Sequence, residues 1–349
     1  MPVYQVQAIG PAGYGSTATA INGAGAVVGN YIAADGTSRA YLWQDGTVTT
    51  LALPAGAVQT WAAAISGAGQ AGGFTDMVQT ASGVVWDSAG NPVATRGSYI
   101  QGMNGNGDAA GMGIDANGVG YAFVTRNGTM TSLGQPGGGA WSSANAINSG
   151  GAAAGTAEAA SGAFRAFLAA ADGSVTLLAG QGGWNSYGMA ISDTGAVAGH
   201  AQRADGRLQA TVWSGQTATG LGTLGGANSY AYAINAAGQV AGYSDVNTEA
   251  GTAAFLYDNG TLYDLNTLLG ANSEWQLLAA YGMNNSGQIV GRGLLNGLEQ
   301  AFLLTPLGPA PQAMMSADTP GGGGVPEPSS IWLVGPPVLA YFALRTRHR

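Results

Sequence analysis

One turn-and-strand motif recurs seven times along this chain, and its spacing is the feature that most constrains the fold. The first copy occupies residues 20–29 and reads AINGAGAVVG. The apolar residue that leads into each turn stands at Ile21, Ile65, Met103, Ile147, Ile191, Ile234 and Met283. The intervals between these positions are 44, 38, 44, 44, 43 and 49 residues. A period in the forties is the length of one four-stranded blade, so the repeat predicts an all-β chain folded as a seven-bladed β-propeller.

Each repeat contains turn residues at fixed places, which divide it into four short strands. Asn or Ser opens the motif, and a glycine follows three residues later at Gly25, Gly69, Gly107, Gly151, Gly195, Gly238 and Gly287. Glycine suits a left-handed turn conformation at little steric cost. Two-residue hairpins are predicted at Asp45-Gly46, Asn127-Gly128, Asp172-Gly173 and Asn259-Gly260, with both residues of each at positive φ. Trp43, Trp86 and Trp213 fall in predicted strands, where we expect them to form blade core.

The two ends of the repeat array complement each other. The last repeat stops at Leu304 without its fourth strand, and residues 3–9 have the pattern of that missing strand. We therefore expect the N-terminal segment to pair into the last blade and close the ring, which leaves no long unpaired edge there. The predicted domains are the propeller at residues 1–305, a Pro/Gly-rich linker at 306–324 and a C-terminal segment at 325–349.

Composition excludes several classes of function. Residues 1–305 contain seven arginines and sixteen acidic residues, and the chain has no lysine. The ring is therefore acidic and lacks the positive surface that nucleic-acid binding requires. The chain also has no cysteine, so disulfides and thiolate metal sites are excluded. We expect no metal, no cofactor and no nucleic-acid partner.

The C-terminal segment has three parts in a fixed order. Pro326-Glu327-Pro328 is followed by an apolar run from Ile331 to Leu344, and the chain ends with Arg345, Arg347 and Arg349. Fourteen residues form a helix of roughly 21 Å, which is shorter than a stable membrane span. Pro336-Pro337 would also break or kink it. The run therefore suits transient insertion, with its arginines on the cytoplasmic side.

Two family resemblances follow from these residues. The C-terminal segment closely resembles the PEP-CTERM sorting signal of bacterial exported proteins, which implies an exosortase-type processing enzyme as a partner. The repeats resemble the HAF-type extracellular repeat family, most clearly in LGTLGGANS at 221–229, Ala233-Ile234-Asn235 and GQVAG at 238–242. The family's histidine is replaced here by Arg39, Arg165 or Ala253. Both resemblances imply export to the cell surface or extracellular matrix. Because Met1 leads directly into the first strand, we expect the export signal to lie upstream of this sequence.

Candidate catalytic residues are few. His200 is the one histidine of the ring, and it follows the last glycine of its motif. We expect it to face solvent or to satisfy a turn, since nothing in the spacing indicates a triad. The GAGQAG string at residues 67–72 matches a dinucleotide-binding pattern but lies in a repeated hairpin, so it is discounted. The chain is predicted not to be an enzyme.

Aromatic residues lead into each motif, four to eight residues before its Ile or Met. They are Tyr14, Trp61, Tyr99, Trp141, Trp184, Tyr230 and Trp275. They fall in segments that connect one blade to the next, so symmetry predicts that they lie near one face of the ring. Aromatic faces stack well on sugar rings, although aromatic residues more often fill the gaps between neighbouring blades. The sequence thus predicts an exported, non-catalytic module associated with exopolysaccharide. A polysaccharide-degrading propeller enzyme (a glycosidase or lyase) and a purely architectural surface protein are the alternatives.

Overall fold

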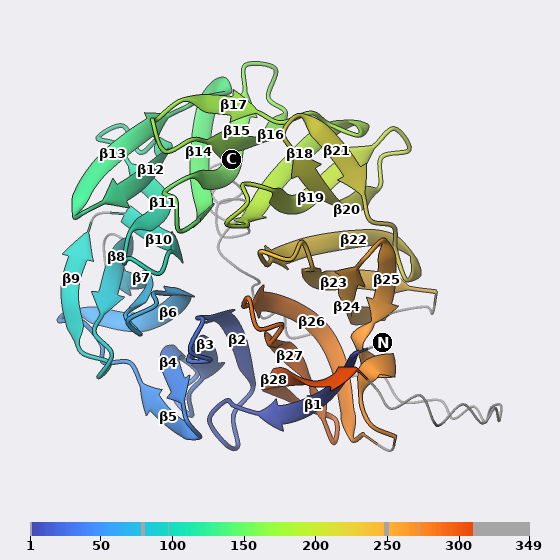
Figure 1. Cartoon of the computed structure of the whole chain (residues 1–349). Coiled ribbons are helices and arrows are strands. Elements are labelled where there is room, and N and C mark those ends of the chain that lie inside the picture. Colours follow the sequence, from blue (N-terminus) through green and yellow to red (C-terminus); the bar gives the residue numbers. More distant parts are fainter. Residues whose placement is uncertain (1, 78–80, 97, 248–250, 272, 310–349) are drawn as a thin grey trace.

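The computed structural model describes residues 2–77, 81–96, 98–247, 251–271 and 273–309. Seven four-stranded antiparallel sheets stand around a common axis (Figure 1). The predicted seven-bladed propeller is therefore confirmed. The described residues also contain one short 3₁₀ helix, η1 (Leu265–Leu268), after the sixth blade.

Each blade begins at the axis and ends at the rim. The inner strands are β2 (Ser16–Ile21), β6 (Ala57–Ile65), β10 (Ser98–Met103), β14 (Gly138–Ile147), β18 (Gly182–Ile191), β22 (Gly225–Ile234) and β26 (Trp275–Met283). The second strands are β3 (Val27–Ile32), β7 (Ala71–Met77), β11 (Ala109–Ile114), β15 (Ala153–Ala159), β19 (Val197–Arg203), β23 (Val240–Val246) and β27 (Ile289–Leu295). The third strands are β4 (Ser38–Gln44), β8 (Ala81–Trp86), β12 (Gly120–Arg126), β16 (Phe164–Ala169), β20 (Leu208–Ser214), β24 (Thr252–Asp258) and β28 (Leu298–Pro309). The outer strands are β5 (Thr47–Thr50), β9 (Pro92–Arg96), β13 (Thr129–Gly134), β17 (Val175–Leu177), β21 (Thr217–Gly220), β25 (Thr261–Asp264) and β1 (Pro2–Ala8).

The ring closes as the sequence predicted. β1 is the outer strand of blade 7, whose order is β1-β28-β27-β26, while blades 1 to 6 follow the chain from β2 to β25. β1 pairs with β28 from Ala8 opposite Phe302 to Pro2 opposite Pro309. The strand thus extends to Pro309, so the predicted boundary at residue 305 is corrected by four residues.

The predicted turns form because the chain places glycine where φ must be positive. The seven motif glycines have φ between 76° and 86°. In three of the four predicted hairpins both residues are at positive φ, with Asp45, Asn127 and Asn259 at 50°, 49° and 48°. The fourth prediction is wrong in detail, because at Asp172-Gly173 only Gly173 has positive φ. There the turn is wider, closed by the Ala170 N–H donating to the Ser174 carbonyl.

A β-bulge interrupts every inner strand two residues before the motif's Ile or Met. The bulge brings the inner strand close to the last glycine of the motif on the second strand. A Cβ at Gly199 would lie 1.9 Å from the Tyr187 carbonyl oxygen, and one at Gly29 would lie 2.2 Å from that of Thr17. The final glycine of the motif is therefore required by close backbone approach rather than by a turn.

Polar residues of the motif join neighbouring blades. A buried Ser or Thr on the inner strand accepts a backbone N–H from the third strand of the preceding blade, as Ser186 does from Ala166 at 3.0 Å. At the other end of the strand, the Asn22 side-chain amide donates to Ser66 O of the next blade, and Asn284 of blade 7 donates in the same way to Asn22 O of blade 1. These contacts give the repeated Ser and Asn a structural role.

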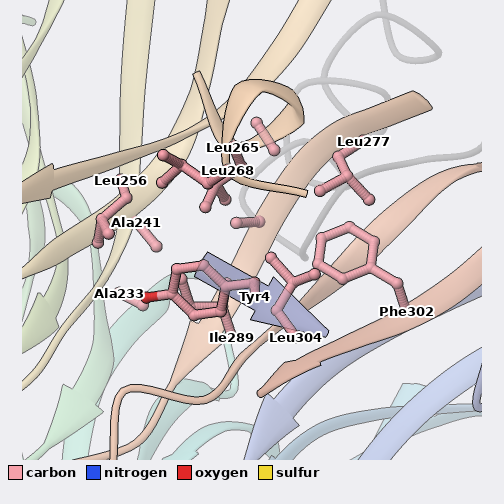
Figure 2. Packing of buried hydrophobic residues seen from close by; sticks show 12 residues of the cluster. Tyr4, Ala233, Ala241, Leu256, Leu265, Leu268, Leu277, Ile289, Phe302 and Leu304 are labelled. Carbon is pink, nitrogen blue, oxygen red and sulfur yellow. The ribbon is translucent and has the colours of Figure 1, made fainter. Parts of the chain in front are cut away.

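Apolar clusters fill the spaces between blades. Figure 2 shows the one between blades 6 and 7, where Tyr4, Leu256 and Phe302 come together from three strands. Trp43, Trp86 and Trp213 are 8%, 0% and 1% exposed, which confirms the predicted blade core. The indole N–H of Trp86 donates to Ala52 O and that of Trp213 to Ala179 O, both at 2.7 Å. Each of these two indoles therefore also ties its blade to the preceding one.

Candidate functional site

The predicted aromatic residues lie on the inner strands more than in the connecting loops. Tyr14 is in the loop between β1 and β2, whereas the other six belong to inner strands. The loop assignment was wrong for those six because the inner strands begin early. In blades 2, 4, 5 and 6 they begin eight or nine residues before the motif's Ile, and in blades 3 and 7 five and eight residues before its Met. The exposure of each aromatic side chain therefore depends on how many residues separate it from the motif's Ile or Met.

One offset places aromatic rings at the same register in four blades. Trp61, Tyr99 and Tyr230 each stand four residues before the motif's Ile or Met, and Tyr187, which the prediction did not include, has the same position. All four are half-buried. Each lies opposite a second-strand residue that follows the motif's last glycine: Phe74, Met112, Tyr243 and His200, respectively.

These rings and their neighbours form a continuous group across blades 4 to 7, here called the aromatic band. It consists of Phe164, Tyr187, His200, Tyr230, Tyr232, Tyr243 and Tyr281. Centroid distances are 4.8 Å for Tyr187–His200, 5.1 Å for His200–Tyr230 and 5.4 Å for Tyr232–Tyr281. A second, shorter group joins Trp61, Phe74 and Tyr99 across blades 2 and 3. Alignment of the repeats by register would have identified Tyr187 from sequence, whereas Tyr232 and Tyr281 stand at the bulge position two residues before the motif's Ile or Met.

His200 is a buried member of this band, so its predicted solvent-facing or turn position is wrong. It is 8% exposed in β19 and packs between Tyr187 and Tyr230. Burial lowers the pKa of His200 from 6.5 to about 3, which keeps the imidazole neutral near pH 7. Its Nδ1 has no hydrogen-bond partner. A neutral imidazole among aromatic rings is a packing group in this conformation.

Burial also keeps Tyr232 and Tyr243 of the band protonated. It raises the pKa of Tyr243 to about 12 and raises that of Tyr232 well above its usual value. The band ends at Arg292, whose Nε donates to the Tyr281 hydroxyl at 3.2 Å and whose Nη1 pairs with Glu299 at 3.0 Å. Apart from that compensated pair, the band presents apolar rings and neutral hydroxyl groups.

Trp184 and Tyr14 display their rings to solvent. Trp184 is 58% exposed and Tyr14 is 38% exposed. The Trp184 backbone is held on both sides, because its N–H donates to the Gln202 side chain at 3.0 Å and its carbonyl accepts from Arg165 Nη1. Tyr14 packs against Tyr31, with ring centroids 5.6 Å apart. Both stand seven residues before the motif's Ile, at the end of the inner strand away from the motif turn.

The remaining two predicted residues are packed into the structure. Trp141 is 3% exposed, and its indole N–H donates to the Met112 sulfur at 3.1 Å. Trp275 is half-buried against Phe302 of its own blade, at 6.2 Å between centroids. For these two, filling space accounts for the aromatic side chain. The accessible candidates are therefore Tyr14, Trp61, Tyr99, Trp184 and Tyr230, joined by Tyr187.

The described residues contain no group of three His, Cys, Asp or Glu side chains that could hold a metal ion. Several of their carboxylates stabilise turns, as Asp35 does by accepting from Thr37, which lowers the pKa of Asp35. The residues of the predicted sorting signal lie outside the described residues; they are Pro326, Glu327, Pro328, Arg345, Arg347 and Arg349. Among the residues that are described, no helix is long and apolar enough to cross a membrane.

Sequence comparison connects part of the chain to a known family. Residues 142–296 match the family described as Protein of unknown function (DUF3466). This range begins within the inner strand of blade 4, covers the rest of that blade and blades 5 and 6, and includes the inner and second strands of blade 7. No curated protein matches the chain.

Comparison with solved structures supports the fold. The β-propeller domain of the Trilobed protease from Pyrococcus furiosus is similar at a TM-score of 0.54 with 10% identity, over 84% of this chain and 98% of that one. A puromycin-hydrolyzing peptidase from Mycobacterium tuberculosis has a TM-score of 0.50 and 13% identity, over 80% and 49% of the two chains. TolB from Acinetobacter baumannii is a weaker match, with a TM-score of 0.47 and 12% identity, over 84% of this chain and 64% of that one. The chain thus spans less than two thirds of the last two proteins. The Pyrococcus furiosus domain is described as having an open velcro topology, whereas here β1 closes the ring.

Proposed function

We propose that this chain is an exported, non-catalytic module of the cell surface or extracellular matrix. In this proposal it holds neutral polysaccharide on the aromatic side chains of its propeller. One observation carries the binding part: Trp184 is 58% exposed while its backbone is fixed by Gln202 and Arg165. A large exposed ring on a rigid support binds with little loss of conformational freedom.

The surroundings of Trp184 suit a neutral sugar. The Trp184 ring can stack on the apolar face of a pyranose. The hydroxyl groups at the edge of the sugar then remain free to form hydrogen bonds. The half-buried Tyr187 and Tyr230 lie on the inner strands of its own and the next blade. An acidic ring without lysine disfavours anionic polymers. Neutral polysaccharide is therefore the ligand class that fits best.

Export is inferred from the C-terminal residues. The order Pro326-Glu327-Pro328, apolar run and arginines is that of an exosortase sorting signal, and a run too short for a stable span suits a segment that is removed after insertion. The processing enzyme is then a partner of this chain. The propeller would reach the cell surface or matrix after processing.

The binding proposal is tested by titrating the full chain with a neutral exopolysaccharide of the producing organism. Tryptophan fluorescence reports binding, and the same samples are assayed for new reducing ends. We expect saturable quenching without new ends. Trp184→Ala should weaken binding by about 1–3 kcal/mol, which is roughly 5- to 150-fold in Kd. Val48→Ala, an exposed apolar residue on the outer strand of blade 1, is the matched control and should bind normally.

The alternatives give different results in the same samples. New reducing ends would make the protein a polysaccharide-degrading enzyme. Absence of any binding would favour the purely architectural role. Equal affinities of the Trp184→Ala and Val48→Ala variants would remove Trp184 from the site.

A further inference from the structure

A cavity of about 210 Å³ opens between blades 2 and 3. Its apolar lining includes Val85 and Val93 from blade 2, and Ile100, Met103 and Phe123 from blade 3. Thr125 stands beside them as a polar lining residue. The cavity is partly open, and its lining is polar as well as apolar. Its volume exceeds the roughly 150 Å³ of a cavity that holds benzene, so it has room for a two-ring indole.

The cavity exists because two filling side chains are missing. In the cluster between blades 1 and 2 the equivalent space holds Leu51 and Trp86, and between blades 4 and 5 it holds Leu178 and Trp213. Blade 3 has Thr125 at the tryptophan position of its third strand. In blade 2 the outer strand β9 ends at Arg96 and β10 begins at Ser98, so the connection that carries Leu51 in blade 1 is absent.

The cavity lies on the side of the ring where the chain leaves the propeller. Gln70 and Gly107, which line it, belong to the motif turns of blades 2 and 3. Pro306 lies at the motif turn of blade 7, since its Cγ would be 3.7 Å from a Cβ at Gly287. The last strand therefore delivers the C-terminal chain to the face on which the cavity is built.

We propose that this cavity binds Trp332 of the chain's own C-terminal segment. Trp332 lies in the apolar sequence Ile331-Trp332-Leu333-Val334, so an indole flanked by aliphatic residues would enter a cavity formed where an indole is missing. The docked segment covers its apolar surface in the full-length chain; that it is later removed by processing rests on the function proposed above. The pocket thus gives the sorting segment a resting place on the propeller.

The intervening chain is long enough. Twenty-two residues lie between Pro309 and Trp332, and four of them are consecutive glycines. A flexible chain of this length has a root-mean-square reach of about 26 Å, compared with a radius of gyration of about 19 Å for a compact domain of this size. Intramolecular attachment then gives an effective concentration in the millimolar range, so even a weak pocket would be occupied.

The native chain has no cysteine, which makes disulfide trapping a clean test. In the full chain, Val93→Cys at the cavity is combined with Leu333→Cys next to Trp332, and crosslinking is followed under a mild oxidant at low protein concentration. Val48→Cys with Leu333→Cys is the control, because Val48 is also exposed on an outer strand. We expect the cavity pair to form an intramolecular disulfide roughly tenfold faster than the control pair.

Two further variants address the pocket itself. Thr125→Trp restores the missing indole, and in the Val93/Leu333 pair it should reduce crosslinking to the control rate while thermal unfolding shows a folded propeller. Trp332→Gly should have the same effect without altering the propeller. Equal rates for the cavity and control pairs would overturn the proposal. Crosslinks formed only between molecules would overturn it too, in favour of a second copy as the occupant.

Discussion

Replacement of Trp213 tests the explanation given for the repeated tryptophan. Its side chain is 1% exposed between blades 4 and 5, and its indole N–H donates to Ala179 O at 2.7 Å. Trp213→Ala removes a large buried ring, which costs about 3–5 kcal/mol of unfolding free energy. Trp213→Phe keeps much of the apolar volume but leaves the Ala179 carbonyl without its donor, which costs about 1–3 kcal/mol.

The measurement is equilibrium unfolding in urea, followed by circular dichroism and by tryptophan fluorescence. Trp184→Ala is the matched control: it is the same substitution at a 58% exposed position, and it should change the unfolding free energy by less than about 0.5 kcal/mol. We expect the unfolding free energy to be highest for wild type and Trp184→Ala, lower for Trp213→Phe and lowest for Trp213→Ala. A loss below about 1 kcal/mol for Trp213→Ala would refute the inter-blade role of this residue.

Two other predictions concern the inner strands. A Cβ at Gly199 would lie 1.9 Å from Tyr187 O, so Gly199→Ala should lower the unfolding free energy by at least about 1–3 kcal/mol in the same urea assay. Gly23→Ala is the control, because a Cβ there has open space and should leave stability unchanged. Equal effects of the two substitutions would contradict the close-approach argument. The pKa of His200 is about 3 in the folded chain and about 6.5 when unfolded, so only the unfolded chain takes up this proton between those pH values. Stability should therefore fall as pH decreases through that window, by up to about 1.4 kcal/mol per pH unit, and His200→Tyr should reduce the slope; an unchanged slope would show that His200 is not buried as a neutral group.

Much of the fold could be predicted because its signals are local. A glycine at positive φ and an Asn-Gly hairpin depend on a few adjacent residues, and repetition of these signals fixed the number of blades. Even the closure by β1 followed from local patterns, because one strand was missing at one end and present at the other. The end of β28 at Pro309 could not be read in this way, since it depends on pairing with β1.

The candidate site could be predicted only in part. The sequence identified Trp61, Tyr99, Trp184 and Tyr230, but it gave the same weight to Trp141, which is buried against Met112. An offset of one residue along an inner strand decides which face of the sheet a ring takes, and a bulge in each strand changes that alternation. Composition and motif spacing do not reveal the bulge.

The sequence by itself determined a closed ring of seven repeats, because each turn and strand is specified within a few residues of chain. The tertiary structure decided which side chains meet between repeats, because those contacts join different blades. The stacking of His200 between Tyr187 and Tyr230 is one such contact. The cavity beside Thr125 also depends on two blades. Thr125 by itself is an ordinary strand residue, and the cavity forms because the neighbouring blade leaves the space next to it unfilled.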